Sequence, residues 1–183
     1  MAIDHQRRNL VIGIAAGSVM LSAGGWFAID GNDKPLTIAA ALAELDKLLA
    51  AYANNNASVN GEWDLAQMLN HCAQSVEYSL SGFPEHKSDL FKHSVGALAF
   101  TAFAAKGRMT HGLSEPIPGA PMLAAGGSVA AAAQRFKASL AQFHSFSGML
   151  TPHFAYGYLS KAQYEQAHVM HFYNHLTQVA HHG

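Results

Sequence analysis

The hydrophobic positions between residues 37 and 181 recur mostly at the three- and four-residue spacing of an amphipathic helix. Leu42, Leu45, Leu48 and Leu49 show this spacing most clearly, with charged residues between them. The pattern predicts helices over residues 37–53, 64–80, 89–106, 128–143 and 160–181. Because no segment alternates apolar and polar residues over any length, the fold class is predicted to be all-α.

The breaks between these helices predict how they are connected. Asp64 with Gln67, and Ser160 with Gln163, have the spacing of a capping box, which starts a helix. Prolines interrupt residues 112–127, so this segment is predicted to be a long crossing loop. One long connection among closely spaced helices favours a four-helix bundle with a crossover loop, spanning residues 36–180. Residues 89–106 are expected to form the most buried helix, because they are nearly all apolar from residue 95 onward.

The first thirty residues form a separate unit in the pattern. Arg7 and Arg8 precede residues 10–29, which carry no charge, and Asp30 begins the polar stretch that follows. A basic start, an apolar middle and a polar end are typical of an export signal, and about 20 apolar residues also suffice to span a bilayer. The glycines and alanines of this stretch make it only moderately hydrophobic, which favours a signal peptide over an anchor.

Residues 1–30 are therefore predicted to be a signal peptide or a membrane anchor. Because both arginines precede the apolar run, a retained segment would hold the domain on the periplasmic side of a bacterial inner membrane. The arginine pair resembles part of a twin-arginine signal. A buried N-terminal helix of the folded domain is the alternative interpretation.

Charge and cysteine content exclude several functions. The formal net charge is -1 and no basic cluster follows Arg8, so no nucleic acid partner is expected. Cys72 is the only cysteine, which rules out an internal disulfide. No Cys-x-x-Cys-His motif is present, so a haem could be held only non-covalently. Cys72 is expected to be a small, buried, apolar residue.

Histidine is unusually frequent, with 12 residues in the chain, and seven of them lie within the last 40 residues. His171 and His175 are four positions apart in a predicted helix, so both imidazoles can reach one ion. His168 lies on the same side. A third ligand is expected from a facing helix, and His71 is the best candidate. The alternative is a set of partly buried, hydrogen-bonded imidazoles that bind no metal.

Several segments resemble the DinB/YfiT-like metalloprotein superfamily. The stretch around Trp63 and His71 is similar to its Trp-and-His helix, and the stretch around His171 and His175 to its closing helix. The chain is most similar to an uncharacterised branch, a domain of unknown function, over about residues 37–178. The segments that carry the resemblance are residues 61–73, 79–84, 118–121, 152–157 and 167–176.

The resemblance implies a four-helix bundle with an up-down-down-up path. It also implies a metal triad whose positions fall on His71, His171 and His175. His168 is expected beside the ligands, as a partner or a proton carrier. His153 and Tyr156 are expected at the pocket mouth, although packing and helix-start hydrogen bonds are the alternative for both.

The predicted site leaves coordination positions open, as catalytic metal sites do. Zn²⁺, Ni²⁺ and Fe²⁺ all suit three imidazoles, so the metal is not identified. A metal at this site would lower the pKa of a bound water or thiol, which predicts a metal-dependent hydrolase or transferase acting on an unidentified small molecule. The resemblance implies thiol transfer or isomerisation of thiol adducts. Glu77, Tyr78 and Glu165 are candidate acid or base groups, although solvated surface charges are the alternative for the two glutamates.

Other functions stay open at this point. The chain is alternatively a non-catalytic periplasmic protein that binds a metal or small ligand, non-covalent haem included, or an interaction module with inert histidines. If the protein contacts a membrane, residues 10–29 are expected to make that contact. The oligomeric state is not predicted, and a dimer stays open.

We expect export to remove the N-terminal segment, because a moderately apolar run behind two arginines is better suited to a signal peptide than to an anchor. Intact-mass spectrometry of the protein from periplasmic and membrane fractions should give a chain that starts near Ser22 or at a later residue. Recovery of the full-length chain in the membrane fraction would instead show an anchor.

Overall fold

The computed structural model describes residues 18–21, 25–28 and 34–182. These belong to two units, Met1–Gly31 and Asn32–Gly183. In the first unit, strand β1 (Ser18–Leu21) pairs antiparallel with β2 (Gly25–Ala28). The rest of the predicted signal or anchor lies outside the described residues. Within the described ranges, no helix is long and apolar enough to cross a membrane.

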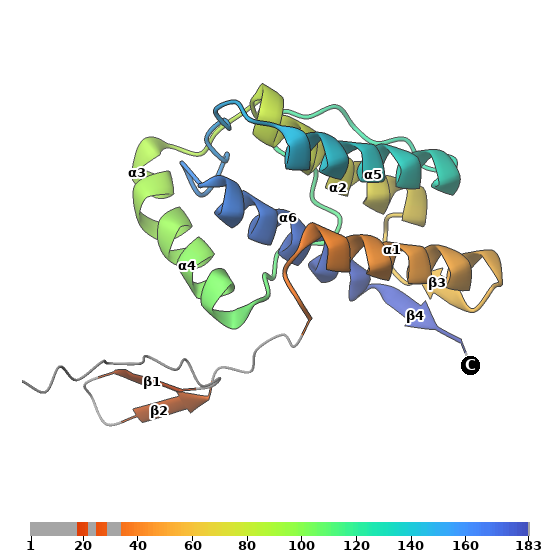
Figure 1. Ribbon diagram of the computed structural model, residues 1–183, viewed down its shortest axis with the longest axis horizontal. Coiled ribbons are helices and arrows are strands. Elements are labelled where there is room, and N and C mark those ends of the chain that lie inside the picture. The colour runs from red at the N-terminus through yellow and green to blue at the C-terminus, as the bar shows by residue number, and fades with distance from the viewer. Residues whose placement is uncertain (1–17, 22–24, 29–33, 183) are drawn as a thin grey trace, which may run out of the picture. The chain divides into compact units, whose positions relative to one another are not determined.

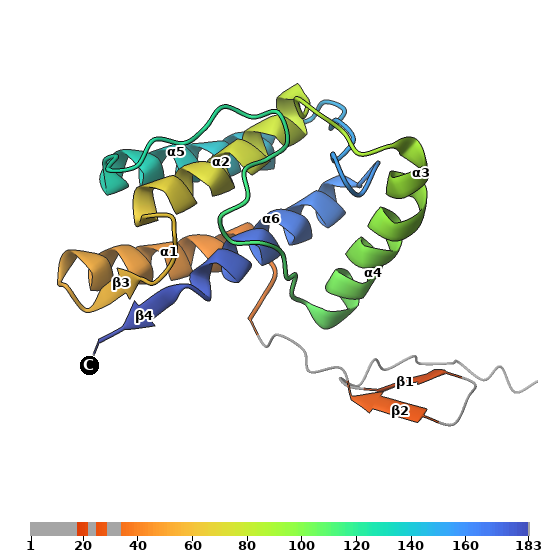
Figure 2. The same ribbon diagram turned by 180° about the vertical axis from the view of Figure 1, so that it is seen from behind.

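The second unit is mostly helical, as the predicted all-α class requires (Figure 1). Its long helices are α1 (Ile38–Ala53), α2 (Leu65–Ser81), α5 (Val129–Ser145) and α6 (Lys161–Leu176). These four helices lie side by side in both views, and α2 and α5 form the most extensive helix pair (Figures 1 and 2).

A shorter helical segment follows α2 and lies beside the N-terminal half of α6 (Figure 2). It consists of α3 (Asp89–Phe91), the π-helical turn η1 (Lys92–Gly96) and α4 (Ala97–Lys106). The expectation that this segment is the most buried is wrong, because Leu90, Val95 and Leu98 are 81%, 58% and 72% exposed. An apolar helix is buried only where a neighbour covers it, and α4 uses mainly Phe100 to pack on α6. Most residues of α2 are buried instead.

The last predicted helix is shorter than expected. It ends at Leu176, and strand β4 (Val179–His181) then pairs antiparallel with β3 (Ala57–Val59). The sequence does not show this pairing because each strand is only three residues long, too short for an alternating pattern. The backbone N–H of Asn60 also donates to the carbonyl of Gln178 at 2.8 Å. The small sheet therefore ties the chain before α2 to the end of α6.

Two hydrophobic clusters pack against different faces of α6. The larger cluster includes Leu45, Leu69, Phe136 and Phe172 and lies among the four long helices. The smaller cluster joins Phe100 and Met109 to Ala167 and Met170 of α6. Cys72 is buried in the larger cluster, as predicted, and burial raises the pKa of its thiol. The second cluster secures the shorter helical segment beside α6.

Gly96 allows a loop to approach the π-helical turn closely. A Cβ atom at this position would lie 1.9 Å from the carbonyl oxygen of Ala155. Any larger residue would clash with the loop that contains Ala155, so only glycine fits at this position. The loop then places Tyr156 against Phe100, with ring centroids 5.6 Å apart. Turns of π-helix inside longer helices are frequent at functional sites, and this one positions a pocket wall.

The long loop joins α4 to α5 over residues 107–128, so it is longer than the predicted segment 112–127; it contains no helix and runs along α2. Both predicted capping boxes are present, at Asp64 with Gln67 and at Ser160 with Gln163. Asp64 has a second role, because its Oδ2 accepts a 2.7 Å hydrogen bond from the backbone N–H of Gly126. The side chain of Gln67 donates to the carbonyl of Leu123 at 3.0 Å. The start of α2 therefore holds the end of the loop.

We expect Asp64→Ala to lower the free energy of unfolding by about 1–2 kcal/mol, because it removes both the helix cap and the loop contact. Asp64→Asn is the matched control, since its Oδ1 keeps the cap and only the bond from Gly126 is lost; it should cost less. Urea unfolding followed by circular dichroism measures both values. Equal stability of Asp64→Ala and the native chain would contradict this role.

Candidate metal centre and adjoining pocket

The three predicted metal ligands converge between α2 and α6. His71 projects from α2, and His171 and His175 project from successive turns of α6. The ring centroids are 4.9 Å apart for His71 and His171, 5.0 Å for His71 and His175, and 4.9 Å for the α6 pair. One nitrogen of each ring lies within 4.8 Å of the others. This group of histidines could hold a metal ion.

Burial leaves the triad with an unsatisfied nitrogen. His71, His171 and His175 are only 3%, 8% and 0% exposed. The Nε2 atoms of His171 and His175 lie 3.2 Å apart and share one hydrogen bond. The Nδ1 of His71 is buried without any hydrogen-bond partner. Such an atom costs on the order of 1–3 kcal/mol, and a cation among these nitrogens would satisfy it. The donor set therefore fits a divalent metal.

The triad is held in the neutral form that a metal requires. Burial lowers the pKa of His71 to about 4 and that of His175 to about 3. It also holds the pKa of His171 well below its ordinary value, and the neighbouring imidazoles add to this effect. Near neutral pH each ring therefore carries one proton rather than two, which leaves one nitrogen of each ring able to bind a metal.

Gln178 is placed to orient His175. Its side-chain amide lies 3.3 Å from Nδ1 of His175. A metal on Nε2 of His175 requires a proton on Nδ1, and that proton needs an acceptor. Rotating the side-chain amide of Gln178 by 180° turns its carbonyl oxygen toward this proton, which it can then accept. Gly61 makes room for this side chain, because a Cβ there would lie 1.9 Å from Oε1 of Gln178.

Trp63 covers the triad from the residues just before α2. Its ring centroid lies 4.9 Å from that of His71, and its ring stacks on His175 at 6.2 Å with an interplanar angle of 10°. An indole packed on two of the three imidazoles excludes water from that side. It also places a fluorescent side chain next to the candidate metal position.

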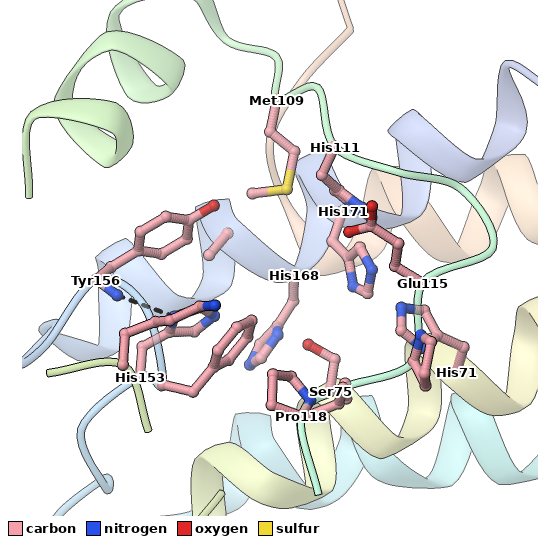
Figure 3. A pocket seen from close by; sticks show the side chains of 15 residues that line it. His71, Ser75, Met109, His111, Glu115, Pro118, His153, Tyr156, His168 and His171 are labelled. Atoms are coloured by element: carbon pink, nitrogen blue, oxygen red, sulfur yellow. Dashed lines mark hydrogen bonds between the residues drawn. The ribbon is translucent and has the colours of Figure 1, made fainter. Parts of the chain in front are cut away.

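A cavity of about 200 Å³ opens beside the triad, between α2, α6 and the long loop (Figure 3). His71 and His171 line one end, and His175 is not among the lining residues. His153 and Tyr156 line the opposite end, with His168 between the two ends. The three residues expected around the metal or its pocket therefore all line the cavity. Its apolar wall consists of Met109, Ile117, Pro116, Pro118, Phe154 and Ala167.

The ring of His153 is fixed in one tautomer. Its Nδ1 accepts hydrogen bonds from the backbone N–H groups of Ala155 at 3.1 Å and Tyr156 at 3.2 Å. Because these groups can only donate, Nδ1 carries no proton and the neutral ring is protonated at Nε2. The ring stacks on Tyr156 at a centroid distance of 4.3 Å. His153 thus both binds the loop, as the alternative interpretation expected, and offers an N–H group at its other nitrogen.

His168 has the complementary arrangement. The hydroxyl of Ser79 donates to the carbonyl of Val76 at 2.6 Å, so its oxygen can only accept from the Nε2 of His168, 3.2 Å away. That bond requires a proton on Nε2 and leaves the Nδ1 of the neutral ring as an acceptor. Burial lowers the pKa of His168 to about 3, which keeps the ring neutral.

The three residues predicted as acid or base groups, Glu77, Tyr78 and Glu165, make contacts that stabilise the fold and do not face the cavity. Glu77 binds Arg135 through both carboxylate oxygens, at 2.9 and 2.7 Å. Glu165 accepts the backbone N–H of Ile38 at 3.0 Å, which joins α6 to the start of α1. Tyr78 packs against Phe83. None of the three candidates lines the cavity.

Four polar residues of the pocket were missed in the sequence: Ser75, Lys87, His111 and Glu115. His111 and Glu115 both lie on the long loop and line the cavity beside His171 (Figure 3). The ring of His111 has centroid distances of 4.8 Å to His171 and 5.2 Å to His175. Sequence periodicity cannot reveal these two loop residues, because a loop has no repeating face. The concentration of histidine in the chain is the only signal that pointed toward His111.

We expect His153 to make the fold sensitive to acid. Burial, with the nearby His168 and His86, lowers its pKa to about 3 from an ordinary value of 6.5. Between these values the unfolded chain binds a proton that the folded chain does not, so the free energy of unfolding falls as pH drops from 6.5 toward 3.

His153→Asn keeps an acceptor for both backbone N–H groups and removes the titrating ring. Urea unfolding at several pH values should show a pH slope that is smaller by roughly 1.4 kcal/mol per pH unit than in the native chain. An unchanged slope would mean that His153 is protonated in the folded chain as well.

The site can be compared with known proteins only at the level of the family. The model of a family of proteins of unknown function, DUF1569, matches residues 33–182, which include the triad and the whole cavity. No curated protein and no solved structure is significantly similar to the chain. The match covers nearly all of the helical unit, and the chain therefore belongs to the DUF1569 family of proteins of unknown function.

Proposed function

We propose that this protein binds one divalent metal ion through His71, His171 and His175 and acts on a small molecule in the adjoining cavity. The observation that carries the proposal is the buried, unpartnered Nδ1 of His71 within a group of neutral imidazoles. Hydrogen-bonded core histidines would not leave such an atom unsatisfied. The cavity beside the triad supports a site that meets a ligand rather than a closed structural one.

We propose further that the helical unit is a bundle of the DinB/YfiT-like type. In this proposal α1, α2, α5 and α6 are its four helices, and residues 112–127 form the crossover connection. The positions of the candidate ligands support it, because one histidine lies on the second helix and a His-x-x-x-His pair on the last. The predicted signal segment favours export, so we place the domain in the bacterial periplasm.

The reaction that we propose is hydrolysis or thiol transfer. When bound, a divalent metal supplies Lewis acidity to a group that enters the cavity. At the far end, the Nε2–H of His153 donates to a polar group of the ligand and the Nδ1 of His168 accepts from one. Glu115 is the only carboxylate among the residues that line the cavity, and it is placed to accept a proton.

The proposed metal site is tested by elemental analysis of protein purified without a histidine tag. We expect about one Zn, Ni or Fe ion for each chain and a loss of this metal in His171→Ala, because two imidazoles hold a divalent ion weakly. His144→Ala is the matched control, since His144 is exposed near the end of α5 and should leave the metal content unchanged. Native protein without metal, or His171→Ala with full metal, would refute the proposal.

The proposed reaction is tested on the metal-loaded protein with a panel of ester, amide and thiol-acceptor substrates. Glu115→Gln should retain the metal and lower the rate by about 100-fold or more, because a general base contributes that much. Circular dichroism checks that each variant is folded. A loaded protein that binds panel compounds without converting them would instead be a metal-dependent binding protein.

A further inference from the structure

The part of the chain that the structure describes holds two buried side-chain nitrogen or oxygen atoms without a hydrogen-bond partner. One is the Nδ1 of His71 and the other is the Nε2 of His111. Buried polar atoms are nearly always paired, so each exception requires an explanation. Both atoms belong to rings that surround the α6 pair, His171 and His175.

The unpartnered nitrogen of His111 is a lone pair rather than an N–H group. The other nitrogen, Nδ1, lies 2.7 Å from the carbonyl oxygen of Gly112, which can only accept. Nδ1 therefore carries the proton, and the neutral ring has none at Nε2. A metal-ligating imidazole typically has this arrangement, with one nitrogen donating to a carbonyl and the other directed at the ion.

His111 is also held in place by contacts that a surface histidine would not need. The side-chain amide of Asn174, itself buried on α6, donates to the backbone carbonyl of His111 at 3.4 Å. Asn174 lies directly before His175, so the same turn of α6 carries a triad ligand and the residue that holds the loop. Figure 3 shows His111 beside His171, at the end of the cavity where the triad lies.

We propose that His111 is a fourth protein ligand of the metal, supplied by the long loop; this inference rests on the proposed metal site. The nitrogens that already lie within 4.8 Å of one another are those of the triad alone. The ring centroid of His111 is 4.8 Å from that of His171 and 5.2 Å from that of His175, so in this proposal the loop brings the free nitrogen of His111 to the ion. The three helix-borne imidazoles form the base of the site. His111 joins them from a loop, whose position can adjust to the ion more readily than a helical turn.

A fourth imidazole changes what the site can accept. A four-coordinate zinc ion would have no position left for a ligand unless His111 were released. Nickel and ferrous ions take five or six ligands, so they would keep positions open beside the cavity. The proposal therefore favours a metal of higher coordination number for a site that turns over small molecules, and it makes the loop a part of the metal centre.

The test is a titration of the full chain with cobalt(II), followed by the fluorescence of Trp63. Trp26→Phe serves as the background, because it leaves Trp63 as the only tryptophan in the chain. Cobalt(II) bound within the triad should quench the stacked indole. The visible absorption of the same samples reports the number and kind of ligands.

In this background, His111→Ala should weaken cobalt binding at least tenfold and change the visible spectrum, and His171→Ala should also weaken binding at least tenfold, because each variant removes one imidazole ligand. His144→Ala should match the background in both measurements. A folded His111→Ala variant with unchanged affinity and spectrum would overturn the fourth ligand and leave the triad intact. Failure of the native chain to bind cobalt would instead refute the proposed metal site itself.

His111→Cys separates ligation from a structural effect on the loop. A thiolate bound to cobalt(II) gives a sulfur-to-metal charge-transfer band in the near ultraviolet. The native chain provides the control, because Cys72 is buried in the hydrophobic core. Appearance of the band in the variant supports ligation by residue 111. A folded variant with native affinity and no such band would overturn it.

Discussion

The burial of several neutral imidazoles between α2 and α6 is the constraint on which the rest of the structure depends. Removing an imidazole from water disfavours its charged form, so each buried ring needs partners for two nitrogens at fixed positions. Some of these partners are protein groups: Gln178 for His175, Ser79 for His168 and two backbone N–H groups for His153. The nitrogens that remain unpartnered belong to His71 and His111, and both rings pack against His171 and His175. This distribution separates the imidazole nitrogens that protein groups satisfy from those that are available to a metal.

The elements around the site serve to fix these partners. The β3–β4 pairing and the adjacent Asn60–Gln178 bond connect the chain before α2 to the end of α6, where Gln178 reaches His175. The close approaches at Gly61 and Gly96 are required because a Cβ at either position would collide with a residue that shapes the site. Asp64 caps α2 and holds the long loop with a single carboxylate. The same residue therefore starts a helix and fixes the loop that lines the pocket.

The cavity combines fixed polar groups with apolar walls. His153 and His168 are held as neutral rings by burial, and their tautomers follow from obligate donors and acceptors around them. A donor and an acceptor at fixed positions, a few side chains away from the candidate metal position, can orient a ligand without moving. The loop adds His111 and Glu115 to the lining. The site thus has one side made by helices and another made by one loop.

The amino-acid sequence by itself determined the positions of the long helices, both capping boxes, the long loop and the His71, His171 and His175 set. The helices, the caps, the loop and the His171–His175 pair follow from local rules: the 3.6-residue period, the three-residue cap spacing and the alignment of side chains four apart on one helix. His71 was expected because bundle metal sites take ligands from facing helices, and because the family resemblance implied it. The tertiary structure alone decided the exposure of residues 89–106, the β3–β4 pairing, the ion pair of Glu77 with Arg135, and the presence of His111 and Glu115 in the pocket. Each depends on which surface a distant segment covers, and such a contact leaves no periodic trace in the residues that make it.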